Sequence, residues 1–156
     1  MLETGDVVDA EVTNVQVFGI FCQHRGQDLL VKIPEISWVT SFNSCLQFAS
    51  PGDHHAVRII HVDTITAKIA ATIKGRFPDP WRTDQLKVGA THTAIVVRYV
   101  DKSDRYGNNP AYMLELVPGA FVMLEANRLS LGVGESIVVT ISESQPHCRA
   151  VCVTPA

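Results

Sequence analysis

The chain has 156 residues, 46% of them hydrophobic, with 13 basic and 16 acidic side chains. This is enough apolar material for one ordinary domain or two small ones. No stretch approaches the roughly 18 consecutive apolar residues of a membrane span, and the acidic residues 1–6 lack the basic and apolar regions of a signal peptide. We therefore expect a cytoplasmic protein with no membrane partner. The net charge of −3 argues against a strong, indiscriminate nucleic-acid binder, which needs many basic side chains.

The first predicted element is a strand over residues 7–15. Apolar Val8, Ala10 and Val12 alternate with polar residues there, which is typical of a barrel strand with one solvent-exposed face. A second strand is predicted over residues 29–33.

Between these strands, residues 17–21 read Val-Phe-Gly-Ile-Phe. Strict alternation would point Phe18 and Phe21 to opposite faces of a strand. A bulge at Gly19 would reset the alternation and bring both rings onto one surface, where they can stack on flat ligands such as bases. The alternative places one ring in the core and the other over a strand edge. We expect the shared, exposed ring surface.

Turn signals recur at short intervals along the whole chain, and the segments between them are rich in Val, Ile, Thr and Phe. Many short strands with this spacing indicate an all-β fold. The order of turns and strands repeats with a period near 80 residues, which fits two five-stranded barrels in tandem. Pro78 and Pro80 mark a Pro-rich linker. We predict a first domain over residues 1–76, a linker over 77–85 whose Trp81 packs onto one domain, and a second domain over 86–156.

Cysteines and histidines give no sign of a metal site or of catalysis. No C-x-x-C pair occurs among Cys22, Cys45, Cys148 and Cys152, so we expect reduced thiols that are buried or incidental. The closest histidines are His54, His55 and His61, and no Glu or Cys stands at a spacing that completes a metal set. The chain also lacks a G-x-S-x-G elbow and a phosphate-binding glycine loop. We therefore expect no cofactor, no metal and no enzymatic activity.

Five sequence elements, in order, resemble the S1 domain, an OB-fold RNA-binding module named for a ribosomal protein. They are Gly5-Asp6-Val7-Val8, the segment 17–21, Leu30-Val31-Lys32-Ile33-Pro34-Glu35, Gly52-Asp53 followed by the valine-rich strand to Asp63, and Lys68-Ile69 leading to Lys74. The resemblance covers residues 3–81.

This resemblance implies that Phe18 and Phe21 present their rings to RNA bases. Lys32 stands where the family commonly has His, so it keeps a cation toward phosphate and loses a ring that can stack. Asp63 and Lys68 match an Asp and a basic residue of the family late in the domain.

The second half resembles the family less closely. Its strands are predicted over residues 91–100, 111–116, 120–124, 136–141 and 149–153. It has no Phe-Gly-x-Phe segment, and its aromatic residues Tyr112 and Phe121 lie on separate strands. We interpret it as a degenerate OB barrel that has lost the ligand face; a different small β-domain is the alternative.

The sequence thus predicts two tandem five-stranded OB-fold barrels with weak binding of single-stranded RNA by the first. We expect a role accessory to translation or RNA metabolism, with the ribosome or another protein as a further partner. The alternative is a protein–protein interaction module that uses the barrels as scaffold. The identity of the RNA and the oligomeric state stay open.

Overall fold

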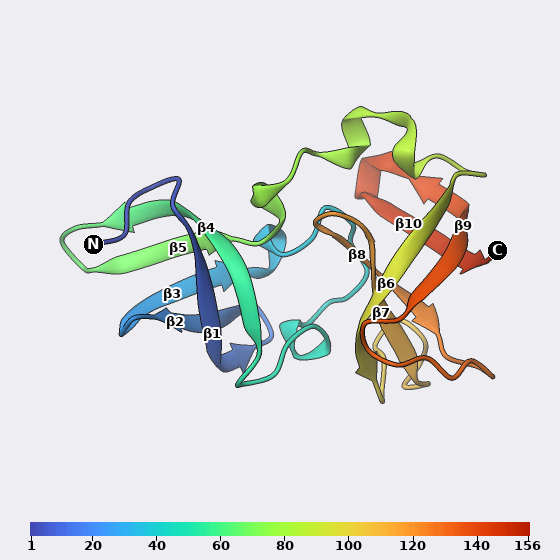
Figure 1. The fold of residues 1–156 in the computed structure, drawn as a ribbon, viewed down its shortest axis with the longest axis horizontal. Helices are drawn as coiled ribbons and strands as arrows, with labels where there is room; N and C mark the ends of the chain where they lie inside the picture. The colour runs from blue at the N-terminus through green and yellow to red at the C-terminus, as the bar shows by residue number, and fades with distance from the viewer. The chain divides into compact units, whose positions relative to one another are not determined.

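The computed structural model describes all 156 residues and divides into two compact units (Figure 1). The first unit comprises Met1–Ser37 and Ser44–Pro78, and the second comprises Trp38–Asn43 and Asp79–Ala156. Its regular elements are ten strands and short 3-10 helical turns, so the predicted all-β fold is confirmed. None of its helical segments has the length and apolar character needed to cross a membrane.

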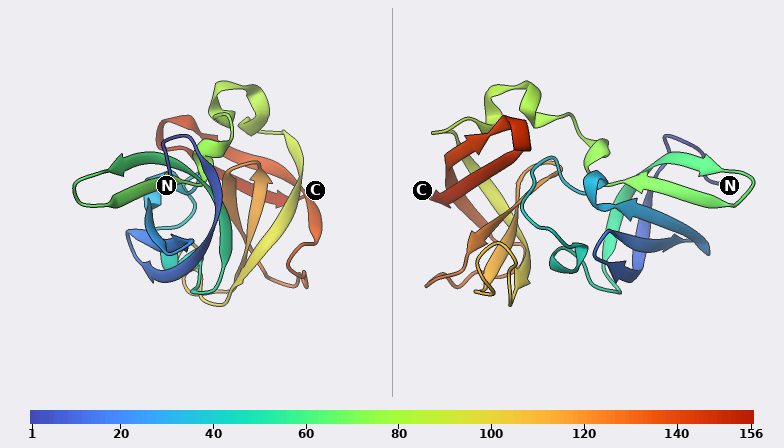
Figure 2. Two further views of the ribbon diagram at one scale, coloured as in Figure 1. Left: turned by 60° about the vertical axis from the view of Figure 1, so that its left-hand side comes forward. Right: turned by 180° about the vertical axis from the view of Figure 1, so that it is seen from behind.

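The first unit is a closed five-stranded barrel. Its strands are β1 (Val7–Gln16), β2 (Gly19–His24), β3 (Gln27–Lys32), β4 (His54–Asp63) and β5 (Lys68–Thr72), and their order around the barrel is β1-β2-β3-β5-β4. β3 and β5 pair in parallel, and every other pair is antiparallel. The hairpin of β4 and β5 projects beyond the neighbouring strands (Figures 1 and 2). This arrangement is an OB-type barrel, as expected.

Alternating apolar residues of all five strands fill the barrel. The buried side chains include Val12, Ile20, Val31, Ile59 and Ala71, each at most 1% exposed. Two strands break the alternation: the register shifts between Val12 and Asn14 in β1, and between Ile59 and His61 in β4. Each shift inserts one extra residue, which bends the strand and turns the following side chain to the other face.

The second unit is a five-stranded sheet. It contains β6 (Thr91–Val100), β7 (Ala111–Val117), β8 (Ala120–Glu125), β9 (Ser136–Gln145) and β10 (Ala150–Pro155), in the order β10-β9-β6-β7-β8. All five strands predicted for the second half are therefore present. The pairing of successive strands repeats that of the first barrel, except that β8 and β10, the counterparts of β3 and β5, are not hydrogen-bonded to each other.

The segment Trp38–Asn43, which connects β3 to β4 in the chain, belongs to the second unit. The Trp38 backbone N–H donates to the carbonyl of Gly119 (2.9 Å), and the Thr40 N–H donates to the carbonyl of Arg149 (2.8 Å). Val39 is 1% exposed and packs in the core of this unit. The segment thus lies between the start of β8 and the residue before β10, the two strands whose edges stay unpaired.

The linker contacts this same unit. The Trp81 indole N–H donates to the Trp38 carbonyl (2.6 Å), and both rings pack on the core of the second unit. The domain boundaries proposed from the sequence stay a prediction, and the sequence did not indicate the place of Trp38–Asn43.

Candidate nucleic-acid interface

Four outward side chains form a row across four adjacent strands of the first barrel. Phe21 of β2 lies opposite Leu30 of β3, Leu30 lies beside Ala70 of β5, and Ala70 lies opposite His61 of β4. The chain neighbours of the first three point inward and are buried: Ile20, Cys22, Leu29, Val31, Ile69 and Ala71. Directly paired residues share a face of the sheet, so this row lies on the outer surface of the barrel. We call these four residues the outer row.

Phe18 meets Phe21 at one end of the outer row. Phe18 lies in the turn between β1 and β2, is 52% exposed, and accepts a hydrogen bond at its carbonyl from the Ile33 N–H (2.8 Å). The ring centroids of Phe18 and Phe21 are 6.0 Å apart with an interplanar angle of 88°. This is a favourable edge-to-face contact, and it places two aromatic rings side by side on an accessible surface.

The prediction of a bulge at Gly19 was wrong. β2 pairs through Gly19 in unbroken register with β3, and the nearby bulge lies in β1. The rings meet because Phe18 belongs to a turn, where strand alternation does not apply. Gly19 is instead required by close packing, since a Cβ atom there would lie 2.9 Å from the Val31 carbonyl oxygen and 3.3 Å from Lys32 Cα. A glycine therefore lets β2 and β3 approach each other closely beside the rings.

Two lysines flank the outer row. Lys32, the last residue of β3, lies opposite Gly19, and Lys68, the first residue of β5, lies opposite Asp63. Each is two residues away from a member of the outer row on its own strand, so each faces outward. Both side chains are exposed, and neither forms an ion pair. Both ammonium groups are thus free to attract phosphate.

Asp63 stabilises the β4–β5 turn. Its Oδ1 accepts hydrogen bonds from the N–H groups of Ile65 (3.0 Å) and Thr66 (3.2 Å). Hydrogen bonds from the Thr66 side chain and then from these backbone groups lower the pKa of Asp63. Its carboxylate therefore holds the turn that presents Lys68. A direct contact of Asp63 with RNA stays a prediction.

The three histidines considered from the sequence lie in three different environments. His55 is largely buried and stacks on Phe48, with ring centroids 5.2 Å apart, and burial lowers its pKa. His54 is exposed, and His61 belongs to the outer row. No three His, Cys, Asp or Glu side chains lie together as metal ligands would.

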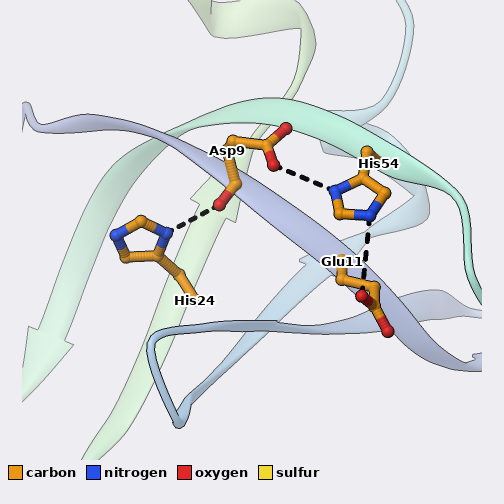
Figure 3. Close-up of polar contacts among 4 residues, drawn as sticks. All are labelled: Asp9, Glu11, His24 and His54. Atoms are coloured by element: carbon orange, nitrogen blue, oxygen red, sulfur yellow. Dashed lines mark hydrogen bonds and ion pairs between the residues drawn. The ribbon is translucent and has the colours of Figure 1, made fainter.

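His54 is surrounded by acidic groups on β1 (Figure 3). Its Nδ1 lies 2.9 Å from Asp9 Oδ2 and its Nε2 lies 3.5 Å from Glu11 Oε1. The hydrogen bond with Asp9 raises the pKa of His54. His24 binds the backbone of the same strand, with Nδ1 2.7 Å from the Asp9 carbonyl oxygen. Two carboxylates make this cluster unsuited to phosphate, and it contains none of the predicted RNA contacts.

In the second unit, the two rings considered from the sequence, those of Tyr112 and Phe121, are buried. Tyr112 and Phe121 are each 5% exposed. The Tyr112 hydroxyl donates to the Leu129 carbonyl (3.1 Å) and accepts from the Leu131 N–H (3.0 Å). Both rings are therefore part of the buried interior of this unit and are not accessible to a ligand.

Residues 1–75 match the S1 RNA binding domain. The first barrel belongs to this family. The chain is also similar to longer proteins, over a stretch that extends past the S1 domain. It is 33% identical over 101 residues to a small ribosomal subunit protein bS1 homolog of Bacillus cereus, a match that covers 64% of this chain and 26% of the relative.

A second relative is a 4-hydroxy-3-methylbut-2-enyl diphosphate reductase of Clostridium acetobutylicum. It is 29% identical over 154 residues, which cover 91% of this chain and 23% of the reductase. The chain thus spans about a quarter of the length of these curated relatives.

Among solved structures, the chain is similar to GSP13 from Bacillus subtilis, with 27% identity, a TM-score of 0.45, and coverage of 49% of this chain and 58% of that one. It is also similar to a chain in the a/eIF2alpha-aDim2p-rRNA complex from Pyrococcus horikoshii OT3, with 21% identity, a TM-score of 0.43, and coverage of 46% and 44%.

Proposed function

We propose that the S1 domain binds single-stranded RNA weakly, with limited sequence preference, through Phe18, Phe21, Lys32 and Lys68. The observation that carries the proposal is the contact between exposed Phe18 and half-buried, outward Phe21, with ring centroids 6.0 Å apart, at the end of an outward row flanked by two free lysines. Bases stack on such rings whatever their sequence, and each stacked base contributes about 1–3 kcal/mol. The net charge of −3 keeps the contribution of phosphate attraction local and small.

A cytoplasmic role accessory to translation or RNA metabolism, without catalysis, belongs to the same proposal. The bS1 relative is a ribosomal protein by name, which supports a partner in translation. The match to the reductase covers 23% of that enzyme, so it gives no reason to assign a reductase reaction to this chain. The motifs of nucleophilic or metal-assisted catalysis are absent from the sequence.

The test is a titration of the full chain with a fluorescently labelled single-stranded 12-nucleotide RNA, followed by anisotropy at two salt concentrations. Phe18→Ala and Phe21→Ala should each weaken binding about fivefold or more, because each removes a stacking ring worth about 1 kcal/mol or more. Lys32→Ala should reduce the salt dependence by one phosphate contact, a slope of about 0.7 for single strands.

Tyr99→Ala and Lys87→Ala are matched controls, since both residues are exposed and lie in the second unit. Both should bind RNA as the wild type does. The absence of binding at low salt would contradict the proposal. Capture of a protein partner that survives nuclease treatment and is lost in Phe18→Ala would favour the alternative, a protein-interaction surface.

A further inference from the structure

His61 stands at the opposite end of the outer row from the two phenylalanines. Three strand-to-strand steps separate it from Phe21, or on the order of 14 Å along the surface at about 4.8 Å per step. Leu30 and Ala70, both half-buried, lie between the two ends of the row. Aromatic rings therefore lie at both ends of this short apolar stretch, Phe21 at one and His61 at the other. Lys32 and Lys68 lie on its two sides.

The bulge in β4 is what turns His61 outward. Val57 and Ile59 point into the barrel at 0% and 1% exposure, so regular alternation would also point His61 inward. Ile60 is instead an extra residue, 41% exposed, and the pairing resumes with His61 opposite Ala70. Bulges commonly redirect a side chain next to a functional surface. The His61 ring is exposed and makes no hydrogen bond within the protein.

We propose that His61 is a further RNA-stacking residue of this domain, so that the RNA lies along the outer row from Phe18 and Phe21 to His61. This inference rests on the proposed function. An imidazole presents a flat face on which a base stacks, as the bases of single-stranded RNA do on His and other aromatic side chains. Lys68 lies on the strand next to His61 and can hold the phosphate that follows the stacked base. His61 thereby adds a ring to a surface on which Lys32 provides a charge but no ring.

The test compares His61→Ala, His61→Phe and His54→Ala in the full chain, titrated with a labelled single-stranded hexanucleotide of mixed sequence. His61→Ala should weaken binding about fivefold or more. His61→Phe should bind as the wild type does, because it keeps a ring without the imidazole nitrogens. His54→Ala is the matched control, since His54 is an exposed histidine of the same strand outside the outer row, and its affinity should not change.

A direct readout separates contact from a structural effect. In heteronuclear NMR spectra of the free and RNA-bound chain, the ring protons of His61 should shift on RNA addition, whereas those of His54 should not. Unchanged affinity in His61→Ala, together with weakened binding in Phe21→Ala, would overturn this inference and leave the proposed function standing. Weak binding by His61→Phe equal to that of His61→Ala would also overturn it, because stacking would then not be the contribution. If the wild type binds no RNA, the proposed function itself fails.

Discussion

Replacing Gly19 by alanine tests the close approach of β2 and β3 beside the two rings. The added Cβ would lie 2.9 Å from the Val31 carbonyl oxygen, 3.1 Å from Leu30 Cδ1 and 3.3 Å from Lys32 Cα. Two of these atoms belong to the backbone of a paired strand, so they cannot rotate away. The strands must separate, or the barrel must distort.

The cost follows from two opposing effects. Forcing a methyl group into a well-packed site costs about 1–3 kcal/mol, whereas replacing glycine lowers the entropy of the unfolded chain and returns about 0.4–1 kcal/mol. The net loss should be about 1–2 kcal/mol, which lowers a urea midpoint by about 0.5–1 M at an m-value near 2 kcal/mol/M.

Circular dichroism and tryptophan fluorescence together locate this loss. Both tryptophans, Trp38 and Trp81, belong to the second unit, so fluorescence follows that unit while circular dichroism follows both. Gly19→Ala should shift the circular dichroism transition more than the fluorescence transition. Gly132→Ala is the control, because a Cβ there meets only the flexible Glu135 side chain. Equal stability of Gly19→Ala and the wild type would refute the reasoning.

Three further outcomes are expected. Proton NMR titration should give His54 a pKa above the ordinary histidine value, because a hydrogen bond to Asp9 favours its charged form. The same titration should give His55 a pKa below that value, because burial disfavours its charged form. Folding with a neutral His55 therefore costs stability as pH falls from the ordinary histidine pKa toward the lowered one, since the unfolded chain then binds a proton that the folded chain does not. Iodoacetamide should label exposed Cys148 before buried Cys22, since burial raises the pKa of the Cys22 thiol to about 11; mass spectrometry of the labelled chain measures this order. Val39→Ala should destabilise the second unit by about 2 kcal/mol, the transfer of two methyl groups plus a cavity, and shift the fluorescence transition.

Strand alternation predicted most of the first barrel from the sequence, because one apolar face per strand is a strong local signal. The resemblance to S1 domains singled out Phe21, Lys32 and Lys68, which the structure puts on one outer face. Strand alternation failed where the period breaks. The bulges at residues 13 and 60 are a threonine and an isoleucine, and neither residue type signals a bulge. The outward position of His61 could not therefore be predicted.

The segment Trp38–Asn43 shows a second limit of sequence reasoning. Its apolar residues, among them Val39 and Phe42, indicate that it is buried, and both are at most 7% exposed. Local pattern does not reveal which surface covers a segment, since any apolar neighbour would satisfy the same residues. Proximity in the chain favoured the first barrel, whereas the open pair of β8 and β10 provides the unpaired strand edges between which the segment lies.

The two units differ most at the strands that could face a ligand. In β2 and β3, inward residues are buried and outward residues such as Phe21, Leu30 and Lys32 are partly or fully accessible. In β7 and β8, residues of both faces are buried almost throughout, as happens when a sheet is covered on both sides. The rings of Tyr112 on β7 and Phe121 on β8 are thus buried and contribute to stability. On the first barrel, Phe18, Phe21 and, by our inference, His61 are the rings available for stacking, and so few rings with two flanking lysines support our proposal of weak, local binding.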